Sequence, residues 1–268
     1  MNKYKEKMDE IEFSFSTLHM YEQCPFAFYL KKICGEIGEN NVYAEIGSLG
    51  HEWNERIFKK EMTVQEALDD CIENFNDMIL EDISESSKEK KYIAMCDYFA
   101  NFNENYEERY EILGVEKEFH WKIGKYKCIG FADLILKDRD SGKVFLVDHK
   151  SATHFIKKDG TPLKNQISNF EAYSKQMYMY ADAMKKEYGF YPDFIVWNHF
   201  LDNGAITVIP FNEDDCKSSL KWVKDTIRKI YKDADFVAGD ENYIMCGSLC
   251  NYRNECDYKE LRKMEEEI

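Results

Sequence analysis

The sequence lacks any apolar run long enough to cross a membrane, and its first residues, MNKYKEKMDEIEFSF, lack the apolar core of a signal peptide. It is also poor in proline (4) and glycine (13), and it contains no low-complexity linker or internal repeat. Basic residues are outnumbered, 36 against 51 acidic ones, and the net charge of −15 argues against indiscriminate coating of nucleic acid. These absences predict a soluble, cytoplasmic protein that does not act on a membrane.

What is present predicts a folded α/β protein. Hydrophobic residues make up 44% of the 268 residues and aromatic ones 15%, which excludes wholesale disorder and suffices for one large domain or two small ones. Helical patterns cover 14–33, with Ser16 as the expected N-cap and a break at Pro25, and then 47–60, 64–82 and 88–110. Period-two patterns follow at 111–124, 126–138 and 143–153. A helix at 169–188, strands at 193–201 and 205–211 joined at Asn203-Gly204, and a helix at 213–233 complete the order. This order predicts an α/β core preceded by a helical insertion or lid.

Two strand-like segments, GFADLIL and VFLVDHKSA, carry charged residues where apolar ones are expected. Asp148 and Lys150 share one face of their strand, whereas His149 points to the other. Two acids, Asp133 and Asp148, beside a lysine are costly in a core unless the acids hold a hard cation and the lysine faces a phosphate. His51, in GSLGHEWNE, is the expected third metal ligand. The pattern therefore predicts a metal-dependent phosphodiesterase, in which the cation lowers the pKa of a bound water.

Simpler interpretations of these residues remain open. Asp148 and Lys150 could form an exposed ion pair of little energetic value. Asp133 could cap a turn, and His51 could be a structural histidine.

Nine cysteines in a cytoplasmic chain indicate thiols or metal ligands more than disulfides. Three lie within eleven residues of each other in CGSLCNYRNEC, close enough to surround one metal centre. Spacing alone does not distinguish zinc from an iron–sulfur cluster, or from unrelated buried thiols. The five scattered cysteines are expected to be small buried hydrophobes: Cys34, Cys71, Cys96, Cys128 and Cys216.

Four segments, GSLGHEW, GFADLIL, VDHKS and QMYMYADAM, resemble the successive motifs of the PD-(D/E)XK nuclease superfamily, in the RecB-like branch that includes the Cas4 proteins. The resemblance extends over residues 14–258. It implies a restriction-endonuclease-like mixed sheet flanked by helices, with an N-terminal helical lid and a C-terminal cysteine cap. A single domain over 1–268 is expected, with a helical region at about 14–110, a catalytic sheet core at 111–211, and a helix and iron–sulfur cap at 212–268.

The resemblance also implies roles for individual residues. The metal ligands would be His51, Asp133, Asp148 (where many members have Glu) and the backbone carbonyl of His149. Lys150 would be the catalytic lysine, with Asp133 and Asp148 as the catalytic acids. Gln176 and Tyr180 match the Q-x-x-x-Y motif that lies beside the scissile DNA strand, and their i,i+4 spacing puts both on one helix face.

In the iron–sulfur nucleases of this branch a fourth cysteine lies near the N-terminus, a position that Cys24 occupies here. The resemblance thus implies a structural 4Fe–4S cluster held by Cys24, Cys246, Cys250 and Cys256, with Zn²⁺ as the rival. The chain has C-x3-C-x5-C where the family usually has C-x2-C-x5-C.

The implied activity is that of an Mg²⁺- or Mn²⁺-dependent DNA exonuclease acting on single strands or duplex ends, in CRISPR adaptation or in phage or plasmid recombination with the proteins of those pathways. The alternatives are a non-catalytic DNA-end-binding or adaptor module of the same fold, and a zinc-stapled protein-interaction domain.

Overall fold

The computed structural model describes residues 3–39, 42–78, 84–157, 159–239, 246 and 249–256. The last four residues of the helix expected at 64–82 and the end of the expected cysteine cap, 257–268, lie outside the described residues. No helix in the described part of the chain is both long enough and apolar enough to cross a membrane.

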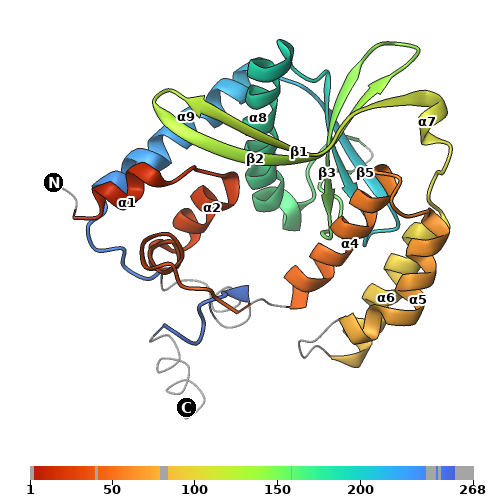
Figure 1. Ribbon diagram of the computed structural model, residues 1–268, viewed down its shortest axis with the longest axis horizontal. Helices are drawn as coiled ribbons and strands as arrows, with labels where there is room; N and C mark the ends of the chain where they lie inside the picture. Colours follow the sequence, from red (N-terminus) through yellow and green to blue (C-terminus); the bar gives the residue numbers. More distant parts are fainter. Residues whose placement is uncertain are drawn as a thin grey trace.

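A five-stranded mixed sheet forms the centre of the protein (Figure 1). The strands are adjacent in chain order and pair antiparallel, except that the third and fourth are parallel. A parallel pair needs a long crossover, and α8 (Ile167–Tyr188) supplies it. The strands are β1 (Tyr110–Ile123), β2 (Tyr126–Asp138), β3 (Val144–Lys150), β4 (Phe194–His199) and β5 (Ala205–Pro210).

The hairpin expected at Asn203-Gly204 is confirmed. Both residues have positive φ, 50° and 63°, as a tight turn between β4 and β5 requires. The strands lie within a few residues of the expected bounds, because alternating apolar residues decide which side chains the sheet buries.

Helices cover both faces of the sheet (Figure 1). On one face, α8 and α9 (Glu213–Lys232) bury a large core that includes Met177, Met184, Ile195 and Trp197. On the other, Phe58 at the end of α4 (Val42–Phe58) packs against Leu134, Val147 and Val196. The α5 (Val64–Met78) and α6 (Glu85–Ala100) helices pack on each other and on α4 with a core of their own. The expected mixed α/β fold with flanking helices is confirmed.

The N-terminal segment contains α1 (Lys5–Glu10), α2 (Phe15–Gln23), α3 (Pro25–Phe28) and a π-helical turn, Tyr29–Cys34. The expected break at Pro25 is confirmed, since Pro25 is the first residue of α3. The expected N-cap was wrong: Ser14, not Ser16, accepts a hydrogen bond from the Thr17 N–H at 3.1 Å. Starting the helix at Phe15 lets it bury that ring, which Ser16 as the cap would leave outside the helix.

Two further expectations were wrong. The helix expected at 88–110 ends at Ala100, and a turn separates it from the short α7 (Tyr106–Arg109). In this turn the Asn103 side chain accepts a hydrogen bond from the Asn105 N–H at 3.1 Å, a local alternative to helical bonding. Of the five cysteines expected to be buried, Cys34 is exposed and Cys96 is half-buried. Cys34 is the last residue of its helical turn, just before Gly35 leaves it with a left-handed φ of 80°.

Candidate active site

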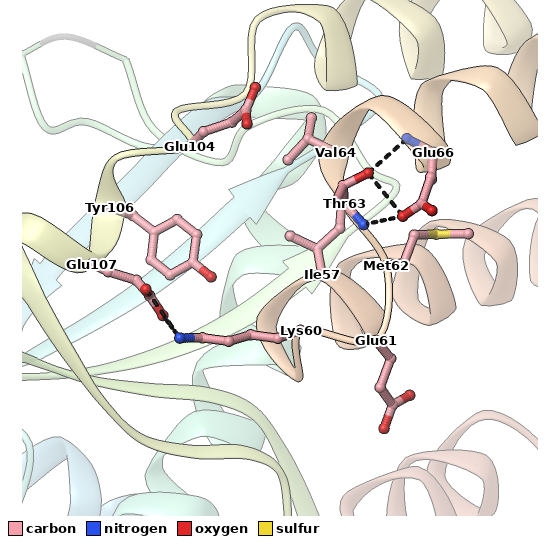
Figure 2. Close-up of a pocket in the computed structure, with 10 residues that line it drawn as sticks. All are labelled: Ile57, Lys60, Glu61, Met62, Thr63, Val64, Glu66, Glu104, Tyr106 and Glu107. Carbon is pink, nitrogen blue, oxygen red and sulfur yellow. Dashed lines mark hydrogen bonds and ion pairs between the residues drawn. The ribbon is translucent and has the colours of Figure 1, made fainter.

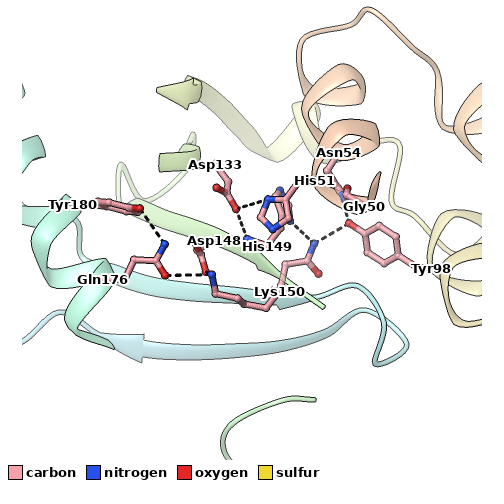
Figure 3. Close-up of polar contacts among 11 residues, drawn as sticks. Gly50, His51, Asn54, Tyr98, Asp133, Asp148, His149, Lys150, Gln176 and Tyr180 are labelled. Carbon is pink, nitrogen blue, oxygen red and sulfur yellow. Dashed lines mark hydrogen bonds and ion pairs between the residues drawn. The ribbon is translucent and has the colours of Figure 1, made fainter. Parts of the chain in front are cut away.

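Three elements bring the expected metal ligands and the expected catalytic lysine together (Figure 3). His51 comes from α4, Asp133 from β2, and Asp148 and Lys150 from β3. The pairing of β2 with β3 ends at Leu134 and Val147. Beyond this pair, the Asp133 carboxylate, and not a backbone carbonyl of β2, accepts a backbone hydrogen bond from β3. Its Oδ2 accepts a hydrogen bond from the His149 backbone N–H at 2.6 Å.

Asp133 and His51 form a close pair, with 3.3 Å between His51 Nδ1 and Asp133 Oδ2. Burial would raise the pKa of Asp133, but the His51 hydrogen bond and the charges of His51, His149 and Lys150 hold it at about 2. Burial likewise lowers the pKa of His51, while Asp133 raises it above its ordinary value. Asp133 is therefore the permanently ionised carboxylate of the site.

Asp148 and Lys150 point to the same side of β3, with 2.6 Å between Lys150 Nζ and Asp148 Oδ2. Burial, opposed by Lys150 and reinforced by Asp133, raises the pKa of Asp148 to about 6. Burial would lower the pKa of Lys150, but the two carboxylates raise it, so Lys150 remains charged. Despite the short ion contact, Asp148 Oδ2 is buried without a hydrogen bond of good geometry. A carboxylate oxygen carries more than one lone pair, so Asp148 Oδ2 can bind a cation in addition to its ion pair with Lys150.

The Lys150 side chain contacts side chains of α8 (Figure 3). Its Nζ donates to Gln176 Oε1 at 3.2 Å, and Gln176 Nε2 donates to the Tyr180 hydroxyl at 3.0 Å. The ammonium group also lies 4.5 Å from the centre of the Tyr173 ring. These contacts fix the lysine in position while it stays charged.

Glu116 on β1 is a site residue that the sequence did not single out. Its neighbours Val115 and Lys117 pair with Leu134 and Ala132, which places it across from Asp133. Burial and the charges of Asp133 and Glu55 raise the pKa of Glu116 to about 7. In the sequence it is one of several glutamates in a strand, so only the fold reveals its place.

Carboxylate and imidazole atoms of His51, Glu116 and Asp133 lie within 4.8 Å of one another. Among the described residues, this group includes Glu116, which was not an expected ligand. It does not include Asp148, an expected ligand, which stands beside the group. Two carboxylates and an imidazole, with the Asp148 carboxylate next to them, suit a divalent cation that prefers oxygen ligands. The donors present therefore fit a metal site.

The model of the PD-(D/E)XK nuclease superfamily matches residues 12–257 of this sequence. The chain belongs to this superfamily. Superfamily members are nucleases that use divalent metals, in agreement with the donor set around Asp133. None of the curated protein sequences compared with the chain matches it.

Solved structures also resemble this superfamily member. One, from Eubacterium rectale and described as a candidate exonuclease, is 14% identical, covers 86% of this chain and 83% of its own, and gives a TM-score of 0.53. At that identity the likeness concerns the fold alone. Another, SSO0001, is 16% identical and covers 87% of this chain and 94% of its own, but its TM-score of 0.32 supports no argument.

Among the described residues, the cysteines predicted to form a metal centre lie close enough to affect the charge of Cys250, but no three of their sulfur atoms lie within 4.8 Å of one another. Burial raises the pKa of the Cys250 thiol, and the neighbouring Cys24, Cys246 and Cys256 raise it further. Cys24 stands directly before α3, at the N-terminal end of that helix. The Cys250 sulfur also accepts a hydrogen bond from the Tyr252 N–H at 3.4 Å, a contact of the kind that stabilises a ligating thiolate.

The cysteine-rich segment is fastened to the chain just after the π-helical turn. Glu39 N–H donates to the Asn251 carbonyl at 2.8 Å, and the Tyr252 hydroxyl donates to the Glu36 carbonyl at 3.2 Å. Gly38 packs so closely that a Cβ there would lie 2.7 Å from the Asn251 oxygen. The segment after the π-helical turn and the cysteine-rich segment are thus joined.

Two hollows in the described part of the protein differ in charge. One, of about 370 Å³, opens beside Lys150 and Gln176 and reaches the cysteine-rich segment, with Phe15 and His19 on its wall. The other, of about 300 Å³ near the start of α5, is lined by four glutamates (Figure 2). Lys60, which also lines this hollow, forms an ion pair with Glu107, with 2.8 Å between Lys60 Nζ and Glu107 Oε1. Carboxylates repel phosphates, so of these two hollows the first is the one that suits a nucleic acid strand.

Proposed function

We propose that this superfamily member is an Mg²⁺- or Mn²⁺-dependent DNA exonuclease that acts on single strands or duplex ends. The observation that carries the proposal is the convergence of Asp133, Asp148 and a charged Lys150, with a buried Asp148 oxygen 2.6 Å from the lysine ammonium group. The order of these residues along the chain is that of the motifs that the sequence resembles.

The cation would be held by His51, Asp133 and Glu116, with Asp148 completing the set. The backbone carbonyl of His149 is a further candidate ligand. On a strand the N–H and C=O of one residue point to the same edge, and the His149 N–H points to Asp133. When bound, the cation would supply an acidified water and neutralise charge on the phosphate.

Lys150 is suited to stabilise the negative charge that develops on the reacting phosphate, because it stays protonated and is fixed by Asp148 and Gln176. Gln176 and Tyr180 would lie beside the scissile strand. The hollow next to Lys150 is at the small end of ligand-pocket volumes, about 300–1,000 Å³, and so favours an unpaired strand over a duplex.

We further propose that Cys24, Cys246, Cys250 and Cys256 hold a 4Fe–4S cluster, with Zn²⁺ as the alternative. Their proximity and the N–H···S bond from Tyr252 support a thiolate metal centre. Its role would be structural, since Cys24 belongs to the N-terminal segment and the other three follow α9. Iron and sulfide analysis of anaerobically purified protein, set against zinc content, decides between the two.

The first test is cleavage of end-labelled single- and double-stranded DNA with Mg²⁺, Mn²⁺ or chelator. We expect metal-dependent degradation that disappears in Lys150→Ala, His51→Ala, Asp133→Ala and Asp148→Ala, while Lys150→Ala still binds DNA. Lys157→Ala serves as a matched control. Full activity in Lys150→Ala would remove that residue from the chemistry.

A non-catalytic DNA-end-binding or adaptor module is the second candidate, favoured by the net charge of −15. Binding without cleavage by protein with a full metal complement would support it. The proposed setting is the cytoplasm, where cysteines that form no disulfide would stay reduced, alongside CRISPR adaptation or recombination proteins.

A further inference from the structure

A chain of buried hydrogen bonds runs behind the candidate metal site, on the side away from Lys150 (Figure 3). It starts at the backbone carbonyl of Gly50, next to His51 on α4, and ends at the ring of His149 on β3. Between them lie Asn54 of α4, Tyr98 of α6 and Asn198 of β4, whose exposed fractions are 0%, 7% and 9%. We call these three residues the relay.

The direction of every bond in the relay follows from its first acceptor. A carbonyl can only accept, so Asn54 Nδ2 donates to Gly50 O at 2.7 Å. The Asn54 oxygen is then left facing Tyr98, whose hydroxyl must donate to it, at 2.6 Å. The Tyr98 oxygen in turn accepts from Asn198 Nδ2 at 2.8 Å.

The second N–H of Asn198 Nδ2 points to His149 Nδ1 at 2.9 Å. This ring nitrogen must therefore accept, and the proton of the neutral imidazole must sit on Nε2. A backbone carbonyl on α4 thus determines the tautomer of a histidine on β3 through three intervening side chains.

Both ends of the relay adjoin metal-site residues. His149 donates its backbone N–H to Asp133 Oδ2 at 2.6 Å, and its ring contacts that of His51 edge-on, with 6.1 Å between centroids. Gly50 directly precedes His51 and packs against Phe200, whose ring would lie 2.3 Å from an added Cβ. Lateral movement of α4 or of β3 would break at least one bond of the relay.

We propose that Asn54, Tyr98 and Asn198 are positioning residues for the metal site, which hold α4 and β3 at the separation that lets His51 and Asp133 share one cation. The inference rests on the proposed metal-dependent function. Partners that orient metal ligands commonly change metal affinity or activity about 10–100-fold when they are removed.

The test is direct Mn²⁺ titration, followed by the electron paramagnetic resonance signal of free Mn²⁺, on the full chain and on Tyr98→Phe. We expect the Mn²⁺ dissociation constant to rise about tenfold or more in Tyr98→Phe. Cleavage should then need more metal at half-maximal rate but recover most of its rate at saturating metal. Tyr92→Phe removes a hydroxyl from the same helix on the side of Phe75 and should leave the dissociation constant unchanged.

Equal Mn²⁺ affinity in Tyr98→Phe and wild type would overturn the positioning role. A wild-type protein that binds no Mn²⁺ would instead refute the proposed metal site, so the two failures are distinguishable. A loss of active fraction with an unchanged metal midpoint would show a purely structural role and also overturn the inference.

A second measurement needs no variant of the relay. Long-range ¹H–¹⁵N correlation spectra of the wild-type histidine rings, with His149 assigned through His149→Gln, should show the proton on Nε2. A proton on Nδ1 of His149 would contradict the bond directions from which the relay is derived.

Discussion

Glu116→Gln should stabilise the protein when divalent cations are absent and weaken it when they are present. In wild type, Glu116 is partly buried beside Asp133, with Glu55 also near, and these surroundings disfavour its ionised form. Glutamine keeps the size and shape of the side chain but carries no charge. The substitution therefore removes a repulsion that only a bound cation relieves in wild type.

The magnitude follows from the pKa of Glu116, which is about 7 against an ordinary value of 4.5. At about 1.36 kcal/mol per unit of pKa, the ionised Glu116 can lower the free energy of unfolding by at most about 3 kcal/mol. Partial solvent access screens the charge and reduces the expected effect to about 1–2 kcal/mol. Because the folded-state pKa is raised, the wild-type carboxyl group costs nothing below pH 4.5 and destabilises progressively as pH rises through about 7.

The assay is thermal unfolding of both proteins at a series of pH values in buffer freed of divalent cations. Glu116→Gln should unfold about 2–8 °C higher than wild type at about pH 8, at about 2–4 °C per kcal/mol, and match it near pH 4.5. With Mn²⁺ at 100 times its dissociation constant, wild type gains about 2.7 kcal/mol and the order should reverse. A pH-independent difference, or a less stable variant at pH 8 without metal, would refute the reasoning.

Three further predictions concern stability. Gly50→Ala should lower the free energy of unfolding by about 1–3 kcal/mol and reduce metal affinity, because its Cβ would lie 2.3 Å from the Phe200 ring; unchanged unfolding in urea would contradict this. Asn212→Ala should cost about 1 kcal/mol in the same assay, since the Asn212 side chain accepts two backbone N–H bonds at the start of α9, while cleavage stays normal. Cys24→Ala should lower the melting temperature and the iron content more than the rate per folded molecule; a well-folded variant with full metal content would show that Cys24 is not a ligand.

The sheet and the helices could be predicted from the sequence because each depends on a local pattern of apolar residues. The strand containing Asp133 and the hairpin at Asn203-Gly204 are recognisable from alternation and turn residues alone. Helix ends were less predictable: the choice between Ser14 and Ser16 depends on whether Phe15 is buried, which is decided by elements far away in the chain.

The site residues also fall into two groups: those that the sequence predicts and those that only the fold reveals. Asp148 and Lys150 are two residues apart on a strand, so their contact follows from strand geometry, and the family motifs point to both. Glu116 could not be predicted, because its place beside Asp133 depends on the register between β1 and β2. The relay could not be predicted from the sequence either, because Tyr98 and Asn198 belong to no motif, are 100 positions apart, and meet only in the folded chain.

The acidity of the site has a consequence for the order of binding. Asp133, Asp148 and Glu116 face one permanently charged ammonium group, that of Lys150, so at high pH the metal-free site carries two excess negative charges. Such a site repels phosphate, as does the net charge of −15 on the whole chain. One divalent cation neutralises the excess and leaves Lys150 free to attract the strand. DNA affinity measured by fluorescence anisotropy should therefore rise when Ca²⁺, a cation that prefers the same oxygen ligands, is added, and this rise should be smaller in Glu116→Gln, which starts with less repulsion. Equal DNA affinity with and without the cation would mean that the strand is held elsewhere on the protein.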